Sequence, residues 1–224
     1  MGAKTVLKAY FFSILLFLTI GLSGCAKNEH IPVEPNTLEY FLEIALGIEY
    51  GERGDPVLER WESDWKLFIG GNPTKSDLLC LTSITEKIAS LTYIQIVEVE
   101  EDFANIKIFF LPESEFGKRD PYYPPGNVGY FAVYTKKSGE IIRALIQISS
   151  EDPGKERCHA IAEEVSQITG LYADSFTESA SLFFQGFSNL QTLSELDETI
   201  IQLLYDKRLE IGMSEEEIRT ALKN

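Results

Sequence analysis

The stretch CHAIAEEVSQITGLYADS, from Cys158 to Ser175, decides how the rest of the chain is interpreted, because a helical apolar period runs beside a row of polar residues. At about 100° per residue, one face of this helix is apolar and the opposite face is polar. The apolar face carries Cys158, Ile161, Val165 and Ile168, and the outward face carries Glu156, His159, Glu163 and Gln167. An ordinary amphipathic helix with a solvated face explains this pattern, and a functional site on the polar face is the alternative.

Hydrophobic periodicity predicts five strands and four further helices around this stretch. Two long segments, 112–128 and 172–191, have no period and are expected to be loops, and loops as long as the first often cover a binding site. The expected strands are 66–69, 93–97, 105–110, 129–134 and 140–149, and the expected helices are 36–47, 76–91, 194–206 and a short one from 214. These elements predict an α+β fold: a five-stranded mixed sheet packed on two long helices, with a helical C-terminal subdomain, in a single domain at 36–224.

Cap and turn residues set the expected ends of several elements. Asn36 and Ser76 are expected helix caps, and residues 137–139 suit a tight hairpin turn. Residues 214–217, SEEE, have the pattern of a capping box. At the main helix, Asp152 and Pro153 suit a cap and first turn, and Gly170 stands where a left-handed residue closes a helix.

The N-terminus has the pattern of a bacterial lipoprotein signal. Lys4 and Lys8 precede an uncharged apolar run at 9–22, which leads into LSGC and ends at Cys25. The run is short for a membrane span, and small residues before a cysteine are typical of lipoprotein cleavage sites; an N-terminal anchor helix is the alternative. We expect a signal peptide at 1–24, a lipid such as palmitate on Cys25, and a tether at 25–35. The protein is then expected in the cell envelope, extracytoplasmic and, in a cell with two membranes, on the outer one, because Ala26 is not Asp.

The chain is acidic, with 20 Lys and Arg against 35 Asp and Glu and a net charge of -15. This charge disfavours nucleic acid and anionic lipid as partners, because both repel an acidic surface. A divalent metal or a cationic partner is tolerated, although solubility alone explains an acidic composition. Histidine clusters, phosphate-cradling glycine loops and Gly-x-Ser-x-Gly elbows are absent from the sequence, so hydride, phosphoryl and triad hydrolase chemistry lose support.

Two further cysteines, Cys80 and Cys158, each lie on the apolar side of a predicted helix. In an extracytoplasmic compartment they can form a disulfide. Two buried free thiols, which behave as small hydrophobic side chains, are the alternative. The sequence leaves both open.

The order of predicted elements (strand, long helix, four strands, helix, irregular stretch, methionine turn) resembles the zincin metalloproteases, in particular the metzincins. Their motif His-Glu-x-x-His-x-x-Gly-x-x-His aligns onto 163–173, so that Glu164 matches the catalytic glutamate and Gly170 the glycine. Met213 matches the methionine turn. The histidine positions hold Glu163, Gln167 and Ala173 instead, and this departure puts zinc hydrolysis in doubt.

A closer resemblance is to a bacterial lipoprotein family, domain of unknown function 2927, over most of the chain after the signal. The residues that carry it are FLEIALGIEY at 41–50, ANI at 104–106, Arg157-Cys158, Glu163-Glu164-x-x-Gln167-x-x-Gly170-Leu171, Asp174, LYD at 204–206 and GMS at 212–214. The resemblance implies a fold and a site, and it implies no particular reaction.

Catalytic zinc needs three nitrogen or carboxylate ligands and an open position for water. Glu163 can serve as a ligand, Gln167 is a poor one and Ala173 offers none, so any bound ion is expected to be harder, such as calcium or magnesium. A shifted site of His159, Glu163 and Gln167 along one face is an alternative, and a simple surface pair of His159 and Glu163 is another. Glu164 and Asp174 can also hydrogen-bond main-chain groups and hold the loop after Gly170.

Three functions follow from these observations. The first is a membrane-anchored domain that binds a peptide or an envelope protein through its cleft, without zinc hydrolysis and without a cofactor. The second is a metal-dependent peptidase with Glu164 as general base and a non-standard ligand set. The third is a purely structural envelope lipoprotein.

Overall fold

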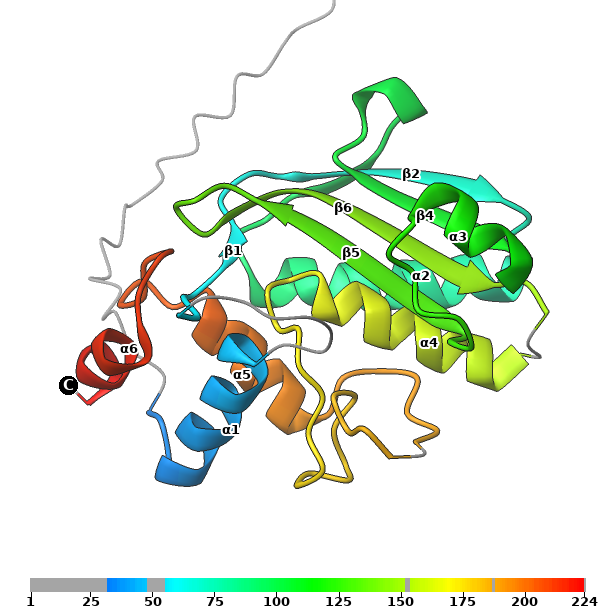
Figure 1. Ribbon diagram of the computed structural model, residues 1–224. Helices are drawn as coiled ribbons and strands as arrows, with labels where there is room; N and C mark the ends of the chain where they lie inside the picture. Colours follow the sequence, from blue (N-terminus) through cyan, green and yellow to red (C-terminus); the bar gives the residue numbers. More distant parts are fainter. Residues whose placement is uncertain (1–31, 48–54, 152–153, 187, 224) are drawn as a thin grey trace, which may run out of the picture. The chain divides into compact units, whose positions relative to one another are not determined.

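The computed structural model describes residues 32–47, 55–151, 154–186 and 188–223 (Figure 1). The predicted signal peptide, Cys25, most of the tether and the expected helix cap at Asp152 and Pro153 lie outside these residues. The described residues belong to one compact unit. Within them, helices fall short of the length and hydrophobicity that crossing a membrane requires.

The centre of the fold is a six-stranded, mostly parallel sheet. Its strands are β1 (Arg60–Trp61), β2 (Trp65–Gly71), β3 (Ile96–Glu98), β4 (Ile106–Leu111), β5 (Gly129–Thr135) and β6 (Glu140–Ser149). β3, β2, β4 and β6 are parallel neighbours, β5 pairs antiparallel with β6 at one edge, and β1 adds two residues beside β6. The α+β class is confirmed, but the expected five strands are corrected to six, because a two-residue strand has no period to detect.

Two long helices, α2 (Lys75–Leu91) and α4 (Gly154–Gln167), pack against each other beneath one face of the sheet (Figure 1). We call this the helix-covered face and the opposite one the open face. The Sγ atoms of Cys80 and Cys158 form a disulfide between the two helices, with Cα atoms 5.6 Å apart. Arg157 adds a buried ion pair, its Nη1 lying 3.0 Å from Asp77 Oδ2. The two helices are therefore joined covalently and electrostatically.

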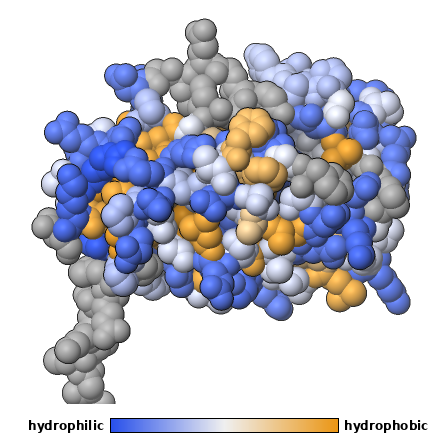
Figure 2. Space-filling view, turned by 90° about the horizontal axis from the view of Figure 1, so that it is seen from below, coloured by the Kyte–Doolittle hydropathy of each residue, from blue (hydrophilic) through white to orange (hydrophobic). Residues whose placement is uncertain are grey.

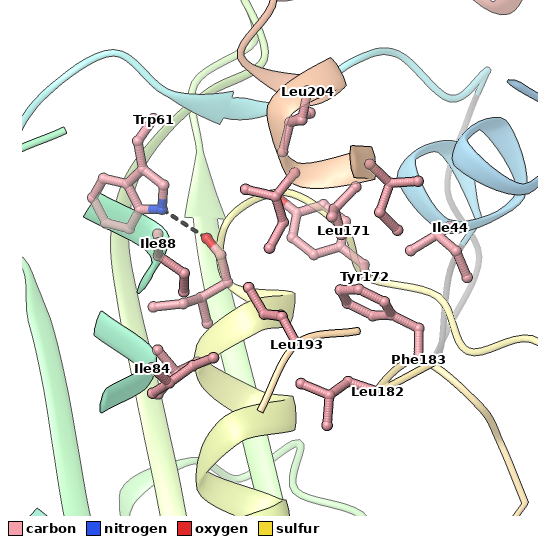
Figure 3. Close-up of a cluster of buried hydrophobic side chains, with 14 of the residues drawn as sticks. Ile44, Trp61, Ile84, Ile88, Leu171, Tyr172, Leu182, Phe183, Leu193 and Leu204 are labelled. Atoms are coloured by element: carbon pink, nitrogen blue, oxygen red, sulfur yellow. Dashed lines mark hydrogen bonds between the residues drawn. The ribbon is translucent and has the colours of Figure 1, made fainter. Parts of the chain in front are cut away.

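The helix-covered face is filled by a single apolar cluster between the sheet, the helices and the segment after α4 (Figure 3). Trp61 of β1 lies in this cluster, and its indole Nε1 donates a 2.7 Å hydrogen bond to the carbonyl of Ile168, just beyond α4. Ile168 and Leu171 are fully buried. The short strand β1 thus fixes the C-terminal end of the helix on which the predicted site lies.

Three shorter helices pack together beside the sheet: α1 (Pro35–Leu46), α5 (Glu195–Leu204) and α6 (Glu215–Leu222). The predicted capping box from Ser214 to Glu217 is confirmed. The expected caps at Asn36 and Ser76 are wrong by two residues each. α1 begins at Pro35 after Glu34, and α2 is capped by Thr74, whose side chain accepts from the amide of Asp77 at 3.2 Å.

The segment 112–128 is not entirely irregular, which corrects the sequence prediction. It contains a short 3-10 turn (Glu113–Glu115) and α3 (Phe116–Arg119). Phe116 is fully buried, and Tyr123 packs edge-on between Phe116 and Tyr130 with ring centroids 5.1 and 5.3 Å apart. A four-residue helix is too short to give a periodic pattern in the sequence.

Candidate functional site

The polar face of α4 becomes steadily more covered toward its C-terminal end. Glu156 is exposed, His159 and Glu163 are half-buried, and Gln167 is only 2% exposed. The expectation that this whole face points outward is therefore wrong for Gln167. The reason is tertiary, since part of the irregular segment after Gly170 contacts this face.

Gln167 and Asp174 join the helix to that segment. The amide Nε2 of Gln167 donates to Oδ1 of Asp174 at 2.9 Å. Burial raises the pKa of Asp174 to about 6, and the hydrogen bond from Gln167 opposes this shift. Asp174 does hold the loop after Gly170, but through a side-chain amide where we expected main-chain groups.

His159 and Glu163 lie one helical turn apart. His159 Nδ1 is 2.5 Å from the carbonyl oxygen of Leu190, so this nitrogen carries the proton, and Nε2 is 3.5 Å from Glu163 Oε2. That second distance exceeds a good hydrogen bond. In the neutral tautomer, Nε2 of His159 therefore carries a free lone pair next to the carboxylate of Glu163. These two atoms are adjacent potential metal ligands.

A third ligand is not brought to this pair. Within the described ranges, His, Cys, Asp and Glu side chains do not gather in threes suited to a metal ion. Gln167, the other member of the predicted shifted site, has its amide nitrogen engaged with Asp174. Two ligating side chains alone do not make a tetrahedral zinc site.

Glu164 projects toward the edge strand β5 from a different side of α4. It is 8% exposed, and a Cβ atom added to Gly129 would lie 2.3 Å from its Oε1. A side chain at the first residue of β5 would therefore displace this carboxylate from its present position. The sequence analysis did not identify Gly129 as a site residue, although a glycine in a strand often marks the close approach of another group.

The third histidine position of the zincin pattern is closed. The amide of Ala173 donates to the Ile44 carbonyl at 3.2 Å, and a Cβ on Gly47 would lie 2.4 Å from Ala173 Cβ. The C-terminal end of α1 therefore packs directly on this methyl group. A longer side chain at 173 would collide with α1.

Gly170 occupies a crowded turn. Its φ is +123°, and a Cβ atom here would lie 2.1 Å from the carbonyl oxygen of Glu59. Glu59 also accepts from the Tyr172 hydroxyl at 3.0 Å, and the Tyr172 ring stacks on Phe131 of β5, 6.0 Å between centroids. The expected positive φ at Gly170 is confirmed, and the turn it makes brings the chain back against β5.

Met213 lies against Leu58, next to Glu59. Its carbonyl accepts from the Leu58 amide at 2.8 Å, and its Sδ accepts from the Glu210 amide at 3.3 Å. Met213 is thus linked to the turn at Gly170 through residues 58 and 59, while Glu163, Glu164 and Gln167 share α4 itself.

The edge of β5 above α4 carries outward-pointing backbone groups. The Ser149 amide donates to the Val128 carbonyl at 2.7 Å. Since hydrogen-bonded pairs alternate along an antiparallel ladder, Tyr130 and Ala132 bond to β6, and residues 129, 131 and 133 direct their N–H and C=O groups away from it. Such an edge is a template for another extended strand.

Residues 35–224 match the family described as protein of unknown function (DUF2927). The match begins at the first residue of α1 and includes α4, β5 and the segment after Gly170, so the chain belongs to this family. Comparison with curated proteins gives no match.

Proposed function

We propose that this member of the DUF2927 family is a lipid-anchored, extracytoplasmic domain that binds an extended peptide segment of an envelope protein along β5 without hydrolysing it. The observation that carries the proposal is the outward edge of β5 at residues 131 and 133, lying beside the buried carboxylate of Glu164 at Gly129. Main-chain hydrogen bonds to such an edge give affinity, and the side chains around it give specificity.

The resemblance to the zincins supports the position of the proposed binding site. The elements β2, α2, β3, β4, β5, β6 and α4 follow one another in the order on which the resemblance rests. Glu164, at the position of the catalytic glutamate, lies on the helix beside the edge strand. This placement supports a binding site along β5, whatever its chemistry.

The residues at the three ligand positions argue against hydrolysis. Glu163 faces His159, Gln167 is hydrogen-bonded to Asp174, and Ala173 packs under α1. A general base at Glu164 needs a metal-bound water of lowered pKa to act on a peptide bond. These contacts use the former ligand positions to hold the fold.

A metal-dependent peptidase is the second candidate, and the His159–Glu163 pair favours it. Together with the side-chain oxygen of Gln167, that pair would hold an ion, and Glu164 would then act as general base. The two candidates differ in whether the isolated protein retains metal.

The compartment is supported by the disulfide between Cys80 and Cys158, because disulfides persist in oxidising environments outside the cytoplasm. The lipid anchor on Cys25 rests on the sequence pattern alone. Mass spectrometry of the membrane-extracted protein tests it directly, since a diacylated Cys25 at the mature N-terminus is expected. An unmodified chain that still begins at Met1 would contradict the anchor.

Metal content separates the two candidates. The full-length protein is equilibrated with zinc, dialysed and analysed for bound metal, beside the variants Glu163→Ala and Glu156→Ala. Glu156 is an exposed acid on the same helix and serves as the matched control. We expect less than stoichiometric zinc in all three. Stoichiometric zinc that is retained by Glu156→Ala and lost from Glu163→Ala would overturn the non-catalytic function.

Peptide binding tests the edge of β5. Decapeptides selected from a displayed library on the full-length protein are measured against Val133→Pro, which removes one outward N–H of β5. Glu98→Pro is the control, because Val99 donates to Leu67, so the Glu98 amide points outward from the opposite edge at β3. We expect Val133→Pro alone to weaken binding roughly tenfold. Equal affinities for both variants, or no selectable peptide, would contradict the proposal.

A further inference from the structure

The open face of the sheet carries a pocket of ≈ 350 Å³. Side chains alternate along β4 and β6, so that Ile106, Ile108 and Ala144 enter the core while their neighbours face the open side. Lys107, Lys118, Arg119 and Arg143 line the pocket, together with the aromatic rings of Phe109 and Tyr134. Four of its nine lining residues are cationic, in a chain whose net charge is -15.

Two of the four cations are neutralised by neighbouring acids. Lys107 Nζ lies 3.0 Å from Glu101 Oε1, and Lys118 pairs with Glu115. Within the part of the chain that the structure describes, Arg119 and Arg143 form no ion pair with an acidic side chain. The pocket therefore keeps an excess of about two positive charges at neutral pH.

Aromatic rings hold both arginines in place. Arg119 Cζ lies 3.6 Å from the centroid of the Phe109 ring, and Arg143 Cζ lies 4.0 Å from that of Tyr134. Phe68 supports Phe109 edge-on at 5.8 Å. Stacking engages the face of a guanidinium and leaves its N–H edge available, so the donors are ordered before any ligand arrives.

We propose that this Arg119/Arg143 pocket binds the phosphate group of a small soluble phosphomonoester. Such a group carries a charge of about -1.5 to -2 at pH 7, which matches the excess charge of the pocket, whereas a single carboxylate does not. Guanidinium groups bind phosphate oxygens through paired hydrogen bonds. The strongly acidic remainder of the chain repels extended anionic surfaces such as a bilayer, and this favours a small ligand.

The test is calorimetric titration of the full-length protein in neutral detergent with inorganic phosphate, and with acetate as the monoanion. We expect saturable binding of phosphate and none of acetate. Arg119→Gln and Arg143→Gln should each weaken phosphate binding roughly tenfold, since each removes charge-assisted hydrogen bonds. Lys137→Gln, an exposed cation in the hairpin turn, should leave it unchanged. Absence of saturable binding, or equal binding by Arg143→Gln and the wild type, overturns the proposal.

A second arm distinguishes a soluble ligand from a lipid headgroup. Trypsin cleavage after the exposed Lys118 and Arg119 is followed with inorganic phosphate, with phosphatidic acid vesicles and with phosphatidylcholine vesicles. We expect soluble phosphate to slow cleavage, with little difference between the vesicles. Protection by phosphatidic acid alone would overturn the assignment to a soluble ligand. Arg119→Gln and Arg143→Gln change no residue of β5, so failure of this phosphate site and failure of the peptide site on β5 are distinguishable.

Discussion

The two faces of the sheet use polar residues in opposite ways. On the helix-covered face, Gln167, Asp174 and His159 are at least half-buried and bonded within the chain. On the open face, Arg119 and Arg143 are exposed and stacked on aromatic rings, with their charges unneutralised by acidic side chains of the described residues. Buried polar side chains of α4 therefore stabilise the fold through bonds within the chain, while the open face keeps hydrogen-bond donors that a ligand can use.

Of the changes considered for the two faces, removing the disulfide should lower the free energy of unfolding most, because the disulfide joins α2 and α4 beneath the sheet. Replacing both Cys80 and Cys158 by Ala is expected to lower the free energy of unfolding by about 4 kcal/mol, since the closed loop is long. Urea unfolding of the variant, and of the reduced wild type, measures the loss. Arg143→Gln on the open face serves as contrast and should stay within about 0.5 kcal/mol of the wild type. Similar losses for both variants would remove the distinction between the faces.

Gly170→Ala should cost about 3 kcal/mol, because the added methyl meets the Glu59 carbonyl and the positive φ is unfavourable for alanine. Gly126→Ala is the matched control. Its φ is +104°, but nothing lies within 4 Å of the added Cβ. The expected loss is therefore only the cost of about 1 kcal/mol for placing alanine at a positive φ. Thermal or urea unfolding of both variants gives the difference. Equal losses would mean that the contact with Glu59 contributes nothing.

Asp174 should make the protein less stable as the pH rises, whereas a salt-bridged acid makes a protein more stable as the pH rises. Its folded pKa of about 6 lies above the ordinary value of 3.8, so the folded state binds more protons than the unfolded state between these values. Stability is therefore highest below about pH 4 for this group and falls as the pH rises through 6, by on the order of 2 kcal/mol.

Asp174→Asn removes the ionisation and keeps an oxygen acceptor for Gln167. The free energy of unfolding of the variant, relative to that of the wild type, should increase as the pH rises from 4 to 7. Urea unfolding of both proteins across this pH range measures the difference. Glu163→Gln on the same side of α4 controls for loss of an acid, and no such gain is expected from it. A difference that is flat with pH would show that Asp174 ionises as it would in water.

Local sequence patterns predicted the long elements well. The apolar period of α2 and α4, the hairpin of β5 and β6, and the capping box at Ser214 were all readable, because each depends on residues close together in the chain. The missed elements, β1 and α3, are two and four residues long. Contacts such as that of Trp61 with Ile168, distant in sequence, define them.

The candidate site was predicted in part. Glu163, Glu164, Gln167 and Asp174 were named, and the Gln167–Asp174 and His159–Glu163 pairs bring some of these residues together. Gly129 and the closing of position 173 by α1 were not foreseen, because they require knowing which strand and which helix pack on α4.

The sequence by itself determined the helices and strands with clear periods, the polar row on α4, the glycine that turns the chain after it, and family membership over residues 35–224. The burial of Gln167, the approach of Glu164 to β5 and the placing of Arg119 and Arg143 in one pocket depend on tertiary packing. The physical reason is that periodicity reports which face of an element is apolar, whereas burial and charge pairing depend on segments far apart in the chain.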